Sequence, residues 1–218
     1  MFENCWESSL ADPARKYLND RKFTDETLRK FRVGFAPASL DDEFSDDDIE
    51  RLEAWKYVEG RVLKYRDRVM FPIVDVLGRV RGFSGRSVGT TTAIKYYNAA
   101  ESEMFKKSEL LFGLDHARKA IFLNNKVIVC EGFTDVLAFH QHGTPIAVAC
   151  MGVALTETHV RTLMRYTDTL YFAFDADKGG NVALKKSVDM CKDLGLNYGL
   201  YKLPEGKDPA SHLLGGQN

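Results

Sequence analysis

The chain has 218 residues, 44% of them hydrophobic, and a net charge of −1, so it has ample apolar content for one large domain or two small ones. It contains no apolar run of 18 residues, and its polar, acidic start (MFENCWESSL) excludes a signal peptide, so no membrane partner is predicted. The four cysteines, Cys5, Cys130, Cys150 and Cys191, form no CxxC pair, which excludes a zinc ribbon and a disulfide framework and favours a reducing, cytoplasmic setting.

The near-zero net charge hides a strong asymmetry along the chain. Residues 41–53 contain eight acids and one arginine, whereas residues 56–126 contain fourteen Lys or Arg against seven Asp or Glu. An excess of about seven positive charges is a plausible footprint for a polyanion. A solvated surface of mixed charge is the alternative interpretation.

The first half of the chain predicts a small α+β unit. Residues 10–36 indicate helices, and Thr24–Thr27 is a good N-terminal capping sequence for a helix that runs to about Phe31. The acidic residues 41–53 predict a loop that leads into a short helix. Residues 61–86 alternate as in a small antiparallel sheet, with a hairpin turn at Asp75–Arg79. A helical pattern follows at 113–120.

From Lys126 onwards, predicted strands and helices alternate. The expected strands are 126–130, 146–150, 169–174 and 198–203, and the expected helices between them are 135–142, 157–166 and 181–194. Such βα repeats predict an α/β fold with a mostly parallel sheet flanked by helices. The polar pair Asn124-Asn125 indicates a boundary, which divides the chain into an N-terminal α+β subdomain (1–124) and a second subdomain (125–218).

Acidic residues follow two of the predicted strands. Glu131 comes directly after the first strand, with Asp135 four residues later, and Asp175 and Asp177 follow the third strand. The carboxyl ends of parallel strands form the edge where open α/β sheets bind ligands, and period-two alternation would put Asp175 and Asp177 on one side. Crowded carboxylates repel one another unless a cation neutralises them, and oxygen ligands favour Mg²⁺ or Mn²⁺. The pattern therefore predicts metal-dependent phosphoryl or nucleotidyl transfer.

These motifs resemble a known family. Glu131-Gly-x-x-Asp135, Asp175-Ala-Asp177 and Lys207-Asp208-Pro209 resemble a Toprim domain. The earlier blocks Tyr17-Leu18…Arg21, Thr24–Thr27, Gly34-Phe35-Ala36-Pro37, Arg66–Ile73, Gly78–Arg86 and Lys95–Asn98 resemble the polymerase domain of DnaG-type primases. The resemblance extends over residues 14–213 and comprises six ordered blocks, so it is much more specific than one Toprim motif.

The resemblance implies an enzyme that makes short RNA primers on single-stranded DNA from nucleoside triphosphates, using two Mg²⁺ or Mn²⁺ ions. It implies that the catalytic residues are Glu131, Asp175 and Asp177, and that the metal ligands are Glu131, Asp135, Asp175, Asp177 and Asp208. Glu131 would ligate metal or transfer a proton. The implied contacts to nucleic acid or nucleotide are Arg66, Arg68, Arg86, Lys95, Tyr96, Asn98, Lys107 and Lys178. A replicative helicase and a separate zinc-binding module are the implied partners, in the cytoplasm of a bacterial cell and with a phage gene as a possible source.

Several alternatives stay open at this point. Asp135 and Asp208 suit the N-terminal cap of a helix as well as a metal site. Ala210 stands where the family pattern has a second acid after the proline, so one ligand is missing or replaced. A natural minimal primase, one subunit of a split primase and an excised core all fit the sequence. A Toprim nuclease and a catalytically weak nucleic-acid-binding subunit of the replication machinery are the alternative functions.

Overall fold

The structure is a computed structural model in which residues 2–38, 45–54, 57–59, 62–88, 94–103, 105–204 and 206–215 are described. The N-terminal half contains the helices α1 (Asp12–Asp20), α2 (Asp25–Lys30) and α3 (Asp46–Ala54), after two short 3₁₀ helices at Asn4–Glu7 and Ser9–Ala11. Its strands are β1 (Gly34–Ala36), β2 (Val58–Glu59), β3 (Val62–Leu63), β4 (Arg68–Val74), β5 (Val80–Ser87) and β6 (Tyr96–Asn98).

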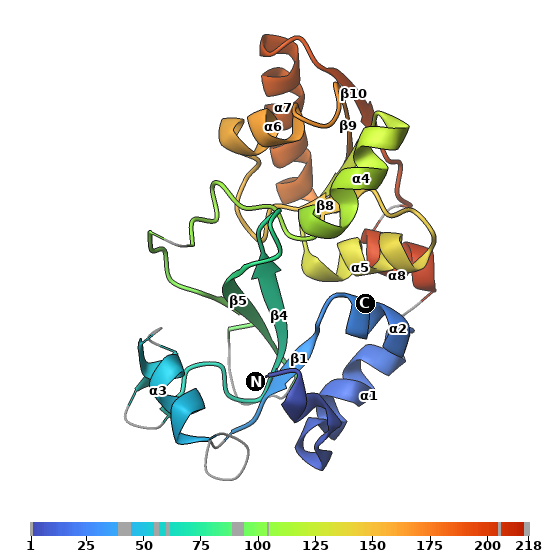
Figure 1. The fold of residues 1–218 in the computed structure, drawn as a ribbon. Helices are drawn as coiled ribbons and strands as arrows, with labels where there is room; N and C mark the ends of the chain where they lie inside the picture. The colour runs from blue at the N-terminus through green and yellow to red at the C-terminus, as the bar shows by residue number, and fades with distance from the viewer. Residues whose placement is uncertain are drawn as a thin grey trace.

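The long hairpin of β4 and β5 forms the centre of the N-terminal half (Figure 1). It belongs to an antiparallel sheet with the order β1-β4-β5-β6, while β2 and β3 form a separate pair. The predicted turn is confirmed, because the Asp75 carboxylate accepts the N–H groups of Leu77 and Arg79 while Gly78 has a φ of 82°. The predicted cap of α2 is also confirmed, since the Thr24 hydroxyl accepts the N–H of Thr27.

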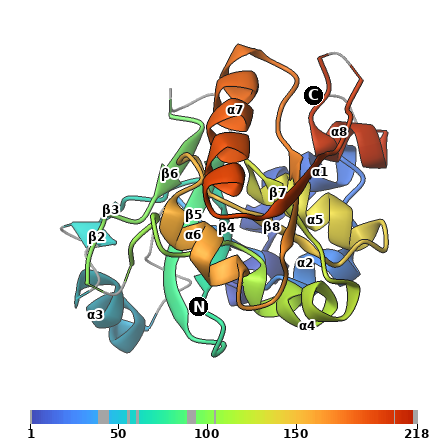
Figure 2. The same ribbon diagram turned by 90° about the horizontal axis from the view of Figure 1, so that it is seen from above.

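The second half is a parallel sheet with helices on both faces, which confirms the predicted fold class. Its strands are β7 (Val127–Cys130), β8 (Ala147–Ala149), β9 (Thr169–Ala173) and β10 (Asn197–Leu200), in the order β10-β9-β7-β8. Its helices are α5 (Phe133–Gln141), α6 (Glu157–Leu163), α7 (Lys178–Asp193) and α8 (Pro209–Leu214), preceded by α4 (Leu114–Asn124). Figure 2 shows α6 and α7 on one side and α4, α5 and α8 on the other.

Some boundaries differ from the prediction. Helix α7 begins at Lys178 and not at Asn181, because the Asp177 carboxylate caps it and its first turn includes Gly179 and Gly180. Residues 34–36 form β1 and not the end of a helical unit, since they pair with β4. The acidic residues 41–44 lie outside the described part of the chain, whereas 46–54 form the predicted short helix.

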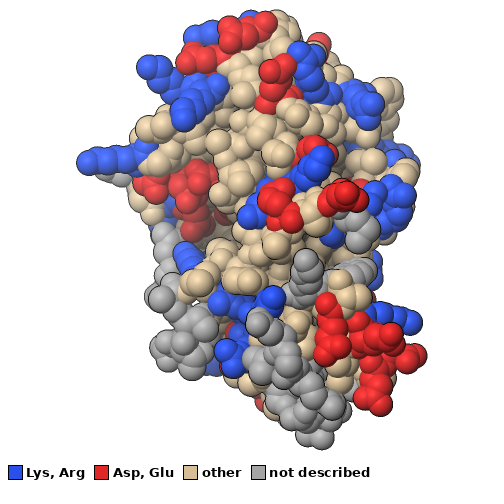
Figure 3. All heavy atoms as spheres, turned by 90° about the vertical axis from the view of Figure 1, so that its left-hand side faces the viewer, with Lys and Arg blue, Asp and Glu red and all other residues tan. Residues whose placement is uncertain are grey.

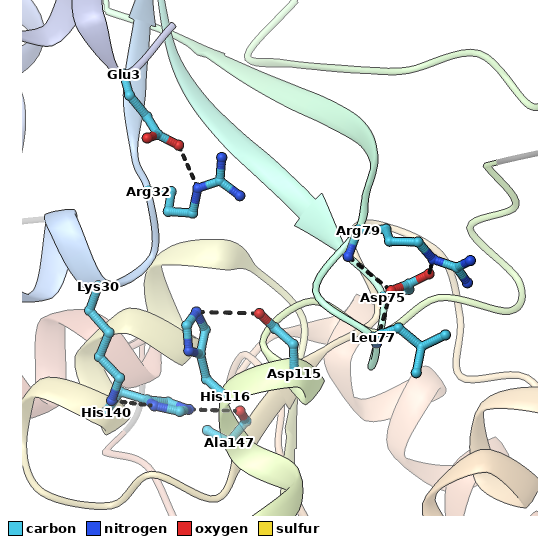
Figure 4. A network of polar contacts seen from close by, with 10 residues as sticks. All are labelled: Glu3, Lys30, Arg32, Asp75, Leu77, Arg79, Asp115, His116, His140 and Ala147. Atoms are coloured by element: carbon cyan, nitrogen blue, oxygen red, sulfur yellow. Dashed lines mark hydrogen bonds and ion pairs between the residues drawn. The ribbon is translucent and has the colours of Figure 1, made fainter. Parts of the chain in front are cut away.

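One continuous apolar core joins the two halves. Phe71 of β4 stacks on Phe133 of α5 with ring centroids 5.1 Å apart. At the edge of this contact, Lys30 of α2 lies 3.4 Å from His140 of α5, whose other ring nitrogen pairs with the Ala147 carbonyl (Figure 4). The buried junction therefore fixes the antiparallel sheet against the carboxyl end of the parallel sheet. No helix in the described residues is long and apolar enough to span a bilayer.

Candidate active site

A cavity of about 270 Å³ lies where the two halves meet. Its lining combines carboxylates with basic and polar side chains, namely Glu131, Asp135, Asp175, Asp208, Arg21, Arg86, Lys95, Tyr96 and Asn98. The acids come from the parallel sheet and its helices, and the bases come from α1 and the antiparallel sheet. The face in Figure 3 likewise shows acidic side chains near mid-height with basic side chains below them, while a second acidic group marks the region of α3.

The four acids that line the cavity form an acidic wall, and Glu131 and Asp175 lie at its centre. Glu131 follows β7, and its Oε1 accepts the backbone N–H of Asp175 at 3.0 Å. Gly180 makes this close arrangement possible, because a Cβ there would lie 2.1 Å from the Asp175 carbonyl oxygen and 3.1 Å from Glu131 Oε1. The first turn of α7 thus packs directly against both acidic residues.

Asp135 and Asp208 connect two short helices beside this pair. Asp135 is buried, and its two carboxylate oxygens accept the N–H groups of Gly132 (3.1 Å) and Ala210 (3.2 Å). Asp208 caps α8 by accepting the N–H of Ser211 at 2.6 Å, with Pro209 in the first turn. Asp208 is the N-cap residue that the sequence predicted, whereas Asp135 is the third residue of α5, whose N-cap is Gly132. Ala210 contributes its backbone N–H to Asp135.

The carboxylates of the acidic wall repel one another, and nearby positive side chains do not fully neutralise them. Burial, together with Asp175 and Asp208, raises the pKa of Asp135 to about 8. Burial, together with Glu131, Asp208 and Asp177, raises the pKa of Asp175 to about 6. The pKa of Glu131 is also raised, by burial and then by Asp177. An all-oxygen donor set of this kind chemically fits a hard divalent cation, which would relieve the repulsion.

The acidic side chains do not yet have the geometry of a complete metal site. Across the part of the chain that the structure describes, no group of three or more His, Cys, Asp or Glu side chains is placed to hold one metal ion. Asp177 does not share a strand face with Asp175 as the period-two argument predicted. Strand β9 ends at Ala173, and Asp177 instead caps α7 by accepting the N–H of Gly180 at 2.8 Å.

Arg86 dominates the basic wall. Its guanidinium lies 4.8 Å from the ring centre of Tyr17 and 5.0 Å from that of Tyr96, so it is held between two aromatic rings. Arg86 is 8% exposed, and among the residues that the structure describes its Nε has no hydrogen-bond partner. Tyr96 also stacks on Phe133, at the start of α5. A buried cation with a free donor beside a cavity is suited to binding a phosphate oxygen.

Arg21 was not among the expected site residues. It follows α1, lines the cavity and lies 4.9 Å from the Tyr17 ring. Tyr17 and Arg21 are four residues apart, and residues at that spacing share one face of a helix. This spacing is the sequence signal that could have identified Arg21 as a site residue. It lies within one of the blocks that carry the family resemblance.

Arg68 has a different role from the expected phosphate contact. Its side chain is buried, and its guanidinium donates to the carbonyls of Gly85 (3.0 Å), Ile94 (3.0 Å) and Lys95 (3.4 Å). The missing side chain of Gly85 leaves room for it, since a Cβ there would lie 2.8 Å from Arg68 Cδ. Arg68 therefore holds Ile94 and Lys95, the residues directly before β6, close to β5.

The remaining expected basic residues do not line this cavity. Arg66 and Lys178 are exposed, and Lys178 begins α7. Lys107 is half-buried, its N–H bonds to Glu101 and its carbonyl pairs with His159. Lys95, Tyr96 and Asn98 do line the cavity, as does Arg86. Eight of the thirteen expected site residues thus line the same cavity.

Comparison with known proteins defines the class of this fold. The family profile of the DNA primase catalytic core, N-terminal domain, matches residues 1–118, and a Toprim-like profile matches residues 128–213. The chain is similar to the solved RNA polymerase domain of Mycobacterium tuberculosis primase DnaG, with a TM-score of 0.85, 32% identity, and coverage of 96% of this chain and 74% of the other. It is equally similar to a DnaG primase catalytic domain solved with single-stranded DNA (TM-score 0.84, 32% identity, coverage 96% and 69%).

Among curated sequences, the DNA primase of Deinococcus radiodurans is 38% identical over 225 residues, which cover 98% of this chain and 39% of the relative. The chain belongs to the family of the DnaG-type DNA primase catalytic core. It spans well under half the length of the curated relatives. Metal dependence is general in this family. The matches do not favour a nuclease or a purely binding subunit.

Proposed function

We propose that this chain is the nucleotidyl-transferring core of a DNA primase, which joins ribonucleotides into short RNA primers on a single-stranded DNA template. The observation that carries this proposal is the mixed cavity between the two sheets. Arg21, Arg86 and Lys95 lie on one wall, and the carboxylates of Glu131 and Asp175 lie on the other. A nucleoside triphosphate needs cations along its phosphates and a charge-neutralising group at the reacting phosphorus, and this cavity provides places for both.

The chemistry is transfer of a nucleotidyl group. The 3′-oxygen of the acceptor forms a bond to the α-phosphorus, the bond from that phosphorus to the pyrophosphate oxygen breaks, and the hydroxyl proton passes to solvent or to a site carboxylate. We assign triphosphate binding to Arg21, Arg86 and Lys95, and base or ribose contacts to Tyr96 and Asn98. Glu131, Asp175, Asp177 and Asp208 are the proposed ligands of two Mg²⁺ or Mn²⁺ ions. Bound there, the ions would stabilise charge on the phosphate and lower the pKa of the hydroxyl.

In our proposal, Asp135 has a structural role in this site. Both of its oxygens are engaged with backbone N–H groups of Gly132 and Ala210. It therefore fixes the start of α8, and with it the position of Asp208, whose carboxylate caps the same helix. This arrangement places Asp135 behind the proposed ligands rather than among them.

We propose different roles for the two subdomains of the chain. We assign template and nucleotide binding to residues 1–124 and metal-dependent catalysis to residues 125–218. Exposed Arg66 is a candidate contact to template phosphates, together with Lys107 and Lys178. A replicative helicase and a separate zinc-binding module are proposed partners in the cytoplasm, by analogy with whole primases.

The test is incubation of the protein with single-stranded DNA, labelled ribonucleotides and Mg²⁺ or Mn²⁺. Short labelled RNA products would support the proposal. Degradation of the DNA without RNA synthesis would replace it with a nuclease function, and DNA binding without either reaction would replace it with a binding function. Whole primases carry further domains, so a pre-annealed RNA primer is supplied in a parallel reaction to remove the need for template recognition at initiation.

A further inference from the structure

A second cavity of about 290 Å³ is also lined by Glu131. It is enclosed by the segment after β8 and by the first turns of α7, through Val153, Leu155, Phe174 and Ala183 among others. It shares Glu131 and Gly152 with the first cavity. The two cavities therefore adjoin at these two residues.

The two cavities differ in charge. The first is lined by Arg21, Arg86 and Lys95, whereas the described lining of the second contains no Lys or Arg, and Glu131 is its one charged residue. Its walls are mainly aliphatic or aromatic, with the thiols of Cys130 and Cys150 at the strand ends. A triphosphate would be repelled from such a space, but a neutral group with flat apolar surfaces fits it.

Two glycines, Gly152 and Gly179, line this second cavity. Gly152 has a φ of 79°, a conformation that other residues rarely adopt, and it follows Met151, which is also left-handed. Gly179, in the first turn of α7, has no side chain to project over the space. The partly buried ring of Phe174 is exposed to the cavity as a surface on which a base can stack.

We propose that the second cavity is the acceptor subsite, which binds the ribose and base of the 3′-terminal nucleoside of the growing primer. This inference rests on the proposed nucleotidyl transfer and says where its second substrate binds. The transfer needs a donor phosphate and an acceptor hydroxyl in direct contact, and the two cavities adjoin at Glu131 and Gly152, which line both. The first cavity has basic side chains that suit the charged triphosphate donor. The apolar second cavity suits the uncharged terminal nucleoside.

Ala183→Leu tests this assignment. Ala183 is half-buried on α7, so a larger side chain there would enter the cavity without disturbing a packed core. The matched control is Val182→Leu, which enlarges the neighbouring side chain on the exposed side of the same helix, where Val182 is 59% exposed. Val153→Phe fills the same cavity from the opposite wall and serves as a second variant if Ala183→Leu unfolds.

The first measurement is extension of an RNA primer annealed to DNA. We expect the KM for primed template to rise at least fivefold in Ala183→Leu, with the KM for the incoming triphosphate unchanged and Val182→Leu like the wild type. The second measurement is fluorescence anisotropy with a primer that ends in a 3′-deoxy nucleotide, in which affinity for the primed junction falls while affinity for single-stranded DNA does not.

An unchanged affinity for the primed junction in both cavity-filling variants overturns the proposal. A rise in the triphosphate KM as large as the rise in the primer KM also overturns it, because the cavity would then belong to the donor. If the wild type incorporates no nucleotide, the proposed function has failed, and the anisotropy comparison still decides whether the cavity recognises a primer end.

Discussion

The acidic and basic walls of the first cavity are built in different ways. The carboxylates follow strand ends or begin helices, and nearby backbone N–H groups hold them, as Asp175 and Gly180 do for Glu131 and Asp177. The basic wall depends on rings from distant segments, since Tyr17 and Tyr96 enclose Arg86. Local sequence is therefore enough to locate the acids, whereas the bases are located only by strand register and packing.

The largest expected effect concerns the acidic wall. Asp175→Asn should reduce nucleotide incorporation by about 100-fold or more, because it removes a charge at the proposed metal site. The thermal midpoint without metal should be equal or higher, since burial and three neighbouring acids already raise the pKa of Asp175 to about 6. Asp189→Asn, on α7 and away from the cavity, is the control for loss of one carboxylate. Incorporation near the wild-type rate in Asp175→Asn would remove this residue from the catalytic account.

The next effect distinguishes a structural arginine from a binding one. Arg68→Ala should lower the free energy of unfolding by about 2 kcal/mol, because it removes a buried hydrogen bond to the Gly85 carbonyl and a second one to the Ile94 carbonyl. Denaturant unfolding measures this loss. At a temperature where the variant is folded, its affinity for single-stranded DNA should stay close to that of the wild type. A large loss of DNA affinity in a stable variant would return Arg68 to the template surface.

Arg86→Ala should act on binding rather than on folding. We expect the KM for the triphosphate to rise about tenfold, the value of one charge-assisted hydrogen bond of roughly 1.4 kcal/mol. Arg165→Ala is the matched control, because Arg165 is exposed and lines neither cavity. Steady-state kinetics with a supplied primer separate the two variants. Equal effects of both substitutions would argue against a special role for the enclosed Arg86.

The smallest expected effect comes from the junction between the halves, away from either wall. Burial, with a further contribution from Lys30 and His116, lowers the pKa of His140 to about 4 in the folded protein (Figure 4). The unfolded chain takes up this proton near pH 6.5 and the folded one near pH 4, so stability falls as the pH drops through that window. The expected loss is about 1 kcal/mol between pH 6.5 and 5.5.

Denaturant unfolding at these two pH values measures the loss. His140→Gln should flatten the dependence, while His142→Gln, which changes an exposed histidine two residues later, should preserve it. The same slope in both variants would assign the effect to other groups.

Much of the fold follows from local sequence. The βα alternation after Lys126, the hairpin at Asp75–Arg79 and the caps at Thr24 and Asp208 are short-range features, and the structure contains all of them. The site residues were harder to predict where contacts between distant segments determine the position of a side chain. Arg68 and Arg86 read alike in sequence, but Gly85 gives the first a path to backbone carbonyls and the two tyrosines direct the second to the cavity.

The central claim is that one nucleoside triphosphate lies between the acidic and basic walls. The most direct test is a crystal structure of this chain soaked with Mn²⁺ and a non-hydrolysable ribonucleoside triphosphate. The account predicts anomalous density within about 2.0–2.4 Å of oxygens from Glu131, Asp175, Asp177 or Asp208, with the triphosphate against Arg86 and Lys95. Ions and triphosphate bound only at other places, at saturating concentration, would contradict it.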